Sequence, residues 1–104
     1  MIVQSTQGFV DSLNRLTAAE ARTAKRFIRP LCQAVEQLAD GWPLTAIAMS
    51  NYVINEERGA SLSAAIGNDR MFGIAFDGFY LAVAVMGKAP EICRLLTVIK
   101  KQSG

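Results

Sequence analysis

The feature that most constrains this chain is the dipeptide Asp77-Gly78, which lies between two apolar runs. Asp-Gly suits a two-residue type I′ turn, because both central residues of that turn need positive φ angles. The pattern predicts a β-hairpin with strands near 70–76 and 79–86. The second strand has no charged residue and is apolar on both faces. We therefore expect it to be covered on both sides, by helices or by another subunit.

Two helices are predicted at the start of the chain. Residues 6–16 place their apolar side chains on one side of a short helix, with Ser5 or Thr6 as its N-cap. Thr17 and Glu20 then have the spacing of a capping box, in which each side chain bonds the other residue's free backbone N–H. This spacing marks the start of a second, longer helix.

The other segments have less specific patterns. The second helix keeps its apolar period across Pro30, which predicts a kinked helix or two helices with Pro30 opening the second. Residues 44–57 are predicted as a helix, with a strand as the alternative. Residues 60–66 alternate like a strand that would extend the hairpin to a meander, with a helix as the alternative. Residues 90–101 have a clean apolar face and the charge order of a C-terminal helix. Gly73, inside a strand, indicates a bulge or a close packing contact.

Together these elements predict an α+β fold. N-terminal helices and a C-terminal helix would pack on a small antiparallel β-hairpin or a three-stranded meander. The 104 residues suffice for a single domain, 1–104, with one core. Hydrophobic residues make up 51% of the chain and charged residues 19%, which is an apolar surplus for so small a domain. We expect a homodimer to cover the excess.

The sequence also bears on the compartment. The longest apolar run, 79–87, is far shorter than the roughly 20 residues of a membrane helix. The first residues lack the charged region and long apolar core of a signal peptide. Cys32 and Cys93 belong to no paired motif and are expected as reduced, buried thiols. We expect a cytoplasmic protein without membrane contact.

The residue types present restrict the chemistry. The chain has no histidine, the commonest general base and metal ligand, so we expect no catalytic site, no metal and no cofactor. The net charge of +2 does not by itself indicate nucleic acid or an anionic membrane. The densest polar cluster contains Glu56, Glu57 and Arg58. An enzyme or ligand site there is a third hypothesis, weighed against an ordinary helix end at the surface.

Candidate binding residues fall into a basic set and an apolar set. The basic set has helical spacing of three and four, which puts it on one face, for phosphates or an acidic partner. The alternative is an ordinary solvated face. The apolar set is a tryptophan next to a proline and the two phenylalanines at the hairpin tip. The alternatives are a tryptophan packed over a helix end and rings that stay in the core. The candidates are Arg22, Lys25, Arg26, Arg29, Trp42, Phe76 and Phe79.

These features favour a non-enzymatic interaction protein, such as an accessory subunit, chaperone or inhibitor. Its partners would be a second copy of itself and an unidentified protein. The alternative is a small DNA- or RNA-binding regulator that uses the basic helix face. Helices followed by a hairpin resemble the architecture of winged-helix proteins, although no residue motif is shared. Asp77 at the hairpin tip argues against that alternative, because such a wing normally presents lysine or arginine.

Overall fold

The predicted hairpin forms the centre of the sheet. The computed structural model describes residues 1–57, 70–87 and 90–101. Strands β3 (Arg70–Phe76) and β4 (Phe79–Met86) pair antiparallel along their length. Asp77 and Gly78 have φ angles of 45° and 79°, which confirms the turn that Asp-Gly predicts.

The hairpin belongs to a mixed five-stranded sheet with the strand order β1-β5-β4-β3-β2. Strand β1 pairs parallel to β5, and the other neighbours are antiparallel. The α+β class is therefore correct. The remaining elements are β1 (Ile2–Ser5), α1 (Gln7–Asn14), α2 (Ala18–Glu36), the short 3₁₀ helix η1 (Leu44–Ala46), β2 (Val53–Glu57) and β5 (Ile92–Lys100).

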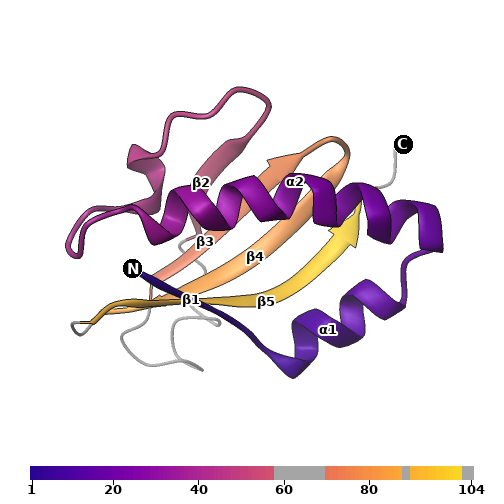
Figure 1. The fold of residues 1–104 in the computed structure, drawn as a ribbon, viewed down its shortest axis with the longest axis horizontal. Coiled ribbons are helices and arrows are strands. Elements are labelled where there is room, and N and C mark those ends of the chain that lie inside the picture. The colour runs from indigo at the N-terminus through magenta and orange to yellow at the C-terminus, as the bar shows by residue number, and fades with distance from the viewer. Residues whose placement is uncertain (58–69, 88–89, 102–104) are drawn as a thin grey trace.

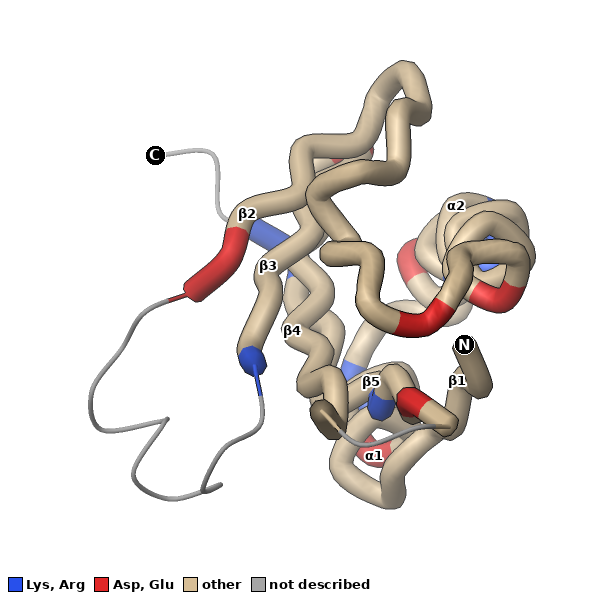
Figure 2. The backbone as a smooth tube through the Cα atoms, turned by 90° about the vertical axis from the view of Figure 1, so that its left-hand side faces the viewer, with Lys and Arg blue, Asp and Glu red and all other residues tan. Residues whose placement is uncertain are grey.

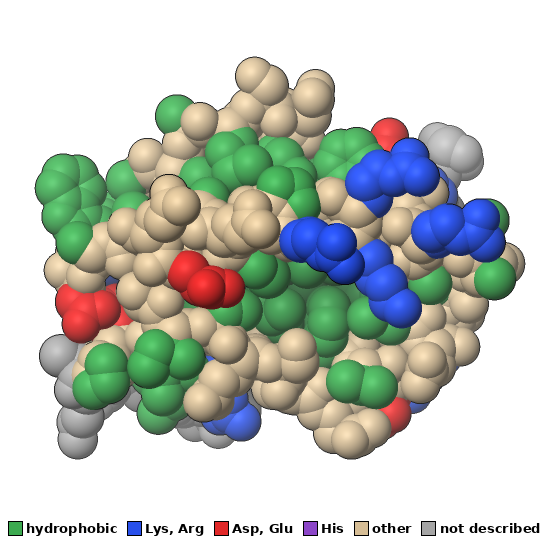
Figure 3. Space-filling model, viewed as in Figure 1, with side chains coloured by type: hydrophobic (Ala, Val, Ile, Leu, Met, Phe, Trp, Pro, Cys, Tyr) green, Lys and Arg blue, Asp and Glu red, His purple; other side chains and the backbone are tan. Residues whose placement is uncertain are grey.

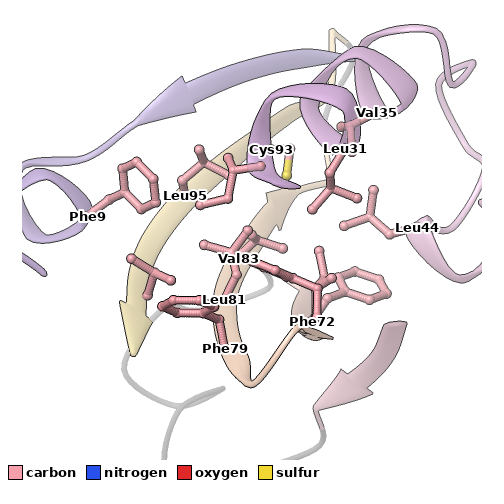
Figure 4. Close-up of a cluster of buried hydrophobic side chains, with 14 of the residues drawn as sticks. Phe9, Leu31, Val35, Leu44, Phe72, Phe79, Leu81, Val83, Cys93 and Leu95 are labelled. Carbon is pink, nitrogen blue, oxygen red and sulfur yellow. The ribbon is translucent and has the colours of Figure 1, made fainter. Parts of the chain in front are cut away.

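Helix α2 crosses one face of the sheet (Figure 1), and the view along α2 shows it standing off that face (Figure 2), whereas α1 lies beside β5 at the β1 end of the sheet. The core fills the space between these two layers (Figure 4). Apolar residues three and four apart on α2 face alternate residues of β3, β4 and β5, because helices and strands repeat with these periods. The central side chains include Leu31, Val35, Phe72, Ile74, Leu81, Val83 and Val98, all 3% exposed or less.

The helix starts agree with their sequence signals. Thr6 caps α1 by accepting a hydrogen bond from the Phe9 N–H at 3.2 Å. Thr17 and Glu20 form both bonds of the capping box at the start of α2. Helix α2 continues through Pro30 as one element, so no second helix begins at that proline.

The predicted C-terminal helix is wrong, because residues 92–100 form β5 between β4 and β1. Ala82 pairs with Thr97 and Val83 with Leu95, which leaves Leu96 as an extra residue in a β-bulge. The bulge changes the spacing of inward side chains on β5 from two residues to three. Apolar residues spaced in this way imitate the three-and-four pattern of an amphipathic helix.

Helix α1 holds the bulged part of β5 in place. The buried Ser12 hydroxyl accepts a hydrogen bond from the Val98 N–H at 2.9 Å and donates one to the Phe9 carbonyl at 2.7 Å. Ser12 therefore satisfies a backbone donor of the strand next to the bulge.

The predicted helix over 44–57 is also wrong. Only η1 is helical, and β2 pairs with β3 over 53–57, so the strand alternative holds for its last part. Asn51 has a φ angle of 73°, which ends any helical path before the β-branched Val53 and Ile54. The expectations for 60–66 lie outside the described residues. The predicted arrangement, with helices packed on a hairpin or a three-stranded meander, is therefore wrong, because the sheet has five strands and residues 92–100 are one of them. The architecture also differs from that of winged-helix proteins.

Candidate functional site

Four basic side chains form one face of α2, which we call the basic face: Arg22, Lys25, Arg26 and Arg29. All four are exposed. Their spacing of three, four and seven residues along a continuous helix puts them side by side over about 10 Å of helix axis. The opposite side of α2, with Ala24 and Ile28, is buried against the sheet. Helix amphipathicity thus directs the cations outward.

The basic face has no acidic partner among the residues that the structure describes. Among the described residues an ion pair joins Arg70 to Glu56, and no described carboxylate lies within ion-pair distance of the four cations of the basic face. Glu20, on the same helix, accepts from the Thr17 N–H in the capping box instead. Like charges three and four residues apart on a helix repel each other, so the basic face is electrostatically unfavourable by itself.

The basic face also borders a hollow. All four cations line a surface pocket of about 480 Å³. Figure 3 shows their side chains as one blue cluster, with hydrophobic surface directly beside it. The structure therefore brings together the four residues that helical spacing selects from the sequence.

Trp42 lies apart from these residues. It is 60% exposed and follows the C-terminal end of α2, whereas Arg29 is seven residues, or about 10 Å, before that end. This exposure contradicts the alternative expectation that the Trp42 ring packs over the helix end. Trp42 and the basic face do not form one site.

Phe76 and Phe79 at the hairpin tip are 2% and 1% exposed. The ring of Phe76 stacks on those of Phe27 and Phe79, with centroid distances of 5.6 and 5.8 Å. The structure therefore agrees with the alternative interpretation, in which these two rings stay in the core. Both residues also border a pocket of about 300 Å³ at the hairpin tip, but almost none of their own surface is exposed in this conformation.

Glu56 and Glu57 do not act together. They are consecutive residues of β2, so their side chains point to opposite faces of the sheet. Glu56 bonds the Arg70 guanidinium at 2.7 and 3.1 Å, and Glu57 accepts from the Tyr80 hydroxyl at 2.5 Å. Paired acid–base chemistry by these two carboxylates is therefore not supported. Arg58 lies outside the described residues.

Tyr80 and Glu57 meet on the sheet face away from α2. The Tyr80 hydroxyl lies over Gly73, where a Cβ atom would be only 2.0 Å from it. This confirms the close packing contact predicted for Gly73. Burial raises the pKa of Tyr80 to about 12, and the hydrogen bond to Glu57 and the charge of that carboxylate act in the same direction.

Both cysteines are free thiols. Burial, and secondarily Cys32, raises the pKa of Cys93 to about 12. Cys32 is half-buried, and burial, followed by the Glu36 charge, raises its pKa as well. In the described ranges, no three acidic, cysteine or histidine residues are grouped as a metal site would require. No helix in those ranges is long and apolar enough to cross a membrane.

A second pocket adjoins the basic face and was not predicted from the sequence. It shares Lys25 and Arg29 with the first pocket and continues between α1, β1 and α2. Its apolar lining includes Phe9 and Ile28. The sequence places both in helical apolar patterns, which indicate core positions and do not reveal an opening between elements.

Comparisons with models of protein families, with curated proteins and with solved structures find no match for this chain.

Proposed function

We propose that this chain is a non-enzymatic interaction domain that binds an acidic segment of a partner protein through the basic face of α2. The observation that carries the proposal is the row of four exposed cations, lining one hollow without a carboxylate partner in the described ranges. An anionic segment placed there would relieve the repulsion between neighbouring cations and complete their pairing.

A DNA- or RNA-binding regulator is the second candidate, because the same cations suit phosphates. A protein partner is favoured by the surroundings of the basic face. The adjoining pocket is lined by apolar side chains such as Phe9, Leu13 and Ile28. Single-stranded nucleic acids bind through exposed aromatic rings beside cations, whereas Phe9 is only 6% exposed.

Self-association is a further part of the proposal. Four large apolar side chains are exposed at positions that alternate with core residues, which puts them on the sheet face away from α2. They are Ile2, Val53, Met86 and Ile99, with exposed fractions of 36% to 58%. A second copy that packs its own sheet face there would cover them through a two-fold interface.

Charge reversal tests the basic face. In Arg26→Glu with Arg29→Glu, binding of a fluorescein-labelled oligoglutamate peptide should weaken by at least about tenfold, because attraction becomes repulsion. Fluorescence anisotropy at low salt measures the affinity. The matched control is Arg15→Glu with Arg94→Glu, which changes the net charge equally at exposed positions off the basic face.

Equal weakening in both double variants would show a general charge effect and overturn the proposal. Oligothymidylate that binds more tightly than the peptide would favour the nucleic-acid candidate instead. Its affinity should then fall with salt along a logarithmic slope of about −3 for four phosphate contacts.

The solution mass tests the dimer. Light scattering coupled to size exclusion should give twice the 11.3 kDa chain mass, and Ile99→Arg should return the protein to the mass of one chain. Val10→Arg is the control, because Val10 is 42% exposed on α1. A monomeric wild type, or dissociation by both variants alike, would contradict an interface on this sheet face.

A further inference from the structure

A cleft opens between the helices at the β1 edge of the sheet. Its volume is about 360 Å³, and four elements contribute to its walls. Phe9, Ile28 and Leu95 are each about 5% to 6% exposed and give it an apolar lining. Figure 4 shows Phe9 and Leu95 side by side, where α1 meets the sheet. The lining residues are Val3, Ser5, Phe9, Leu13, Lys25, Ile28, Arg29, Cys32 and Leu95.

The cleft and the basic face form a continuous surface. Lys25 and Arg29 line both pockets, so each cation borders an apolar lining on one side and the other cations on the opposite side. In Figure 3 the blue side chains of α2 adjoin green hydrophobic surface. A molecule that fits this surface needs an apolar group and several negative charges within about 10 Å.

The outer edge of β1 adds a third feature. The N–H groups of Ile2 and Thr6 bond β5, through the carbonyls of Glu91 and Leu95. Backbone groups of a parallel strand point alternately to its two sides, so those of Val3 and Ser5 point outward. No described strand pairs with β1 on that side. Val3 and Ser5 also line the cleft, so this edge borders it directly.

We propose that the β1 edge and the cleft dock an extended acidic segment of the partner protein, which adds a strand to the sheet. Alternate side chains of that strand would point to the α2 side. Its apolar residues would enter the cleft, and its carboxylates would meet Lys25, Arg29 and the rest of the basic face. This inference rests on the proposed function and specifies the form of the partner.

The three features together select this occupant. A fatty acid would fill the apolar lining, but its single carboxylate cannot occupy four cations along 10 Å of helix, and it offers nothing to the backbone edge. A nucleic acid would match the cations but not the apolar lining. An extended peptide satisfies all three, because strand addition uses backbone hydrogen bonds for affinity and alternate side chains for specificity.

Synthetic peptides test the proposal on the full chain. The probe, called the alternating peptide, is fluorescein-labelled and has one leucine and two glutamates at alternate positions with serines between them, so that all three side chains face α2. The control peptide has serine in place of the leucine. The alternating peptide should bind at least about tenfold more tightly, the usual gain from one buried apolar group. Two N-methylated versions of the alternating peptide, one on the leucine and glutamates and one on the serines, should differ by roughly tenfold in affinity, because only one set of N–H groups faces β1.

Chemical modification of Cys32, which lines the cleft, provides a way to block it. N-ethylmaleimide should modify the half-buried Cys32, whereas burial at 1% exposure protects Cys93. The adduct should weaken binding of the alternating peptide at least about tenfold and leave the affinity of the control peptide unchanged. Cys32→Ser is the control, since it should bind the alternating peptide with or without reagent. Circular dichroism of the adduct checks that the fold is retained.

The outcomes separate this inference from the proposed function. If both peptides bind equally and only charge reversal of Arg26 and Arg29 weakens them, the proposed function stands and the strand-addition site is overturned. If neither peptide binds, both are overturned. Equal affinities of the two N-methylated peptides overturn strand addition. Oleate that binds the cleft with no peptide binding assigns the cleft to a lipid.

Discussion

The two faces of the central hairpin are built from side chains of different size. On the face under α2, β3 and β4 carry large residues such as Phe72 and Leu81, each 1% exposed or less. On the other face the same strands carry several small residues, Gly73, Ala75 and Ala82, beside the larger Met71 and Tyr80. There the hydroxyl end of the Tyr80 ring lies over Gly73 and donates a hydrogen bond to Glu57.

This difference separates stability from association. Large side chains filling the space under α2 remove apolar surface from water, which is the dominant favourable term in folding. The other face carries the contact between Tyr80 and Glu57 and a few buried residues such as Met71, together with exposed residues such as Val53 and Ile99. We therefore expect substitutions under α2 to affect the free energy of unfolding most, and exposed positions on the other face to affect self-association.

The largest effect is expected from Leu81→Ala. Leu81 is fully buried, and its truncation leaves a cavity, so the free energy of unfolding should fall by about 2–5 kcal/mol. Urea denaturation measures this loss. Val53→Ala, at a position 58% exposed on the other face, should change it by less than about 0.5 kcal/mol. Similar losses in the two variants would break the comparison between the faces.

An intermediate effect is expected from Gly73→Ala. The new Cβ atom would lie 2.0 Å from the Tyr80 hydroxyl oxygen and 2.6 Å from the Glu57 carboxylate, so the ring must move and its hydrogen bond must break. We expect a loss of about 1–2 kcal/mol in urea denaturation. Gly87→Ala, which meets no atom within 4 Å, is the control.

In a Tyr80→Ala background, Gly73→Ala should no longer lower the free energy of unfolding. Without the ring, Gly73→Ala should be neutral or stabilising, because glycine inside a strand costs about 0.5–1 kcal/mol relative to alanine. A loss that persists in this background would place the strain somewhere other than at Tyr80.

The smallest effect is expected from Tyr80→Phe, which removes only the hydroxyl. At neutral pH the free energy of unfolding should fall by about 1 kcal/mol, the net worth of a typical hydrogen bond. The pH dependence sharpens this prediction. The pKa of Tyr80 is about 12 in the folded chain against about 10 for an unperturbed tyrosine, so the folded state holds the phenolic proton more tightly.

The stabilisation from this shift is complete below pH 10 and is lost as the pH rises from about 10 to 12. Stability measured over this range should therefore fall less steeply in Tyr80→Phe than in the wild type. The comparison needs the variant, because burial also raises the pKa of Tyr52. Identical slopes would show that Tyr80 titrates as in the unfolded chain.

The basic face was predictable from the sequence, but the cleft beside it was not. A spacing of three, four and seven residues is enough to place Arg22 and Arg29 on one face of a helix. The cleft depends on how far α1 and β1 stand from α2, and its residues, such as Phe9 and Ile28, follow the same apolar pattern as the core. Periodicity identifies a buried side of an element and does not identify a gap between two elements.

The sequence by itself determined the local features: the Asp77-Gly78 turn, the Thr6 cap and the capping box of Thr17 and Glu20. Each depends on steric limits on φ or on hydrogen bonds between residues a few positions apart. Only the tertiary structure decided that residues 92–100 form a strand. That choice depends on pairing with β4 and β1 and on the bulge at Leu96, contacts that join residues far apart in the chain. Long-range pairing can override a local helical pattern, because backbone bonds and buried area together outweigh small differences in propensity.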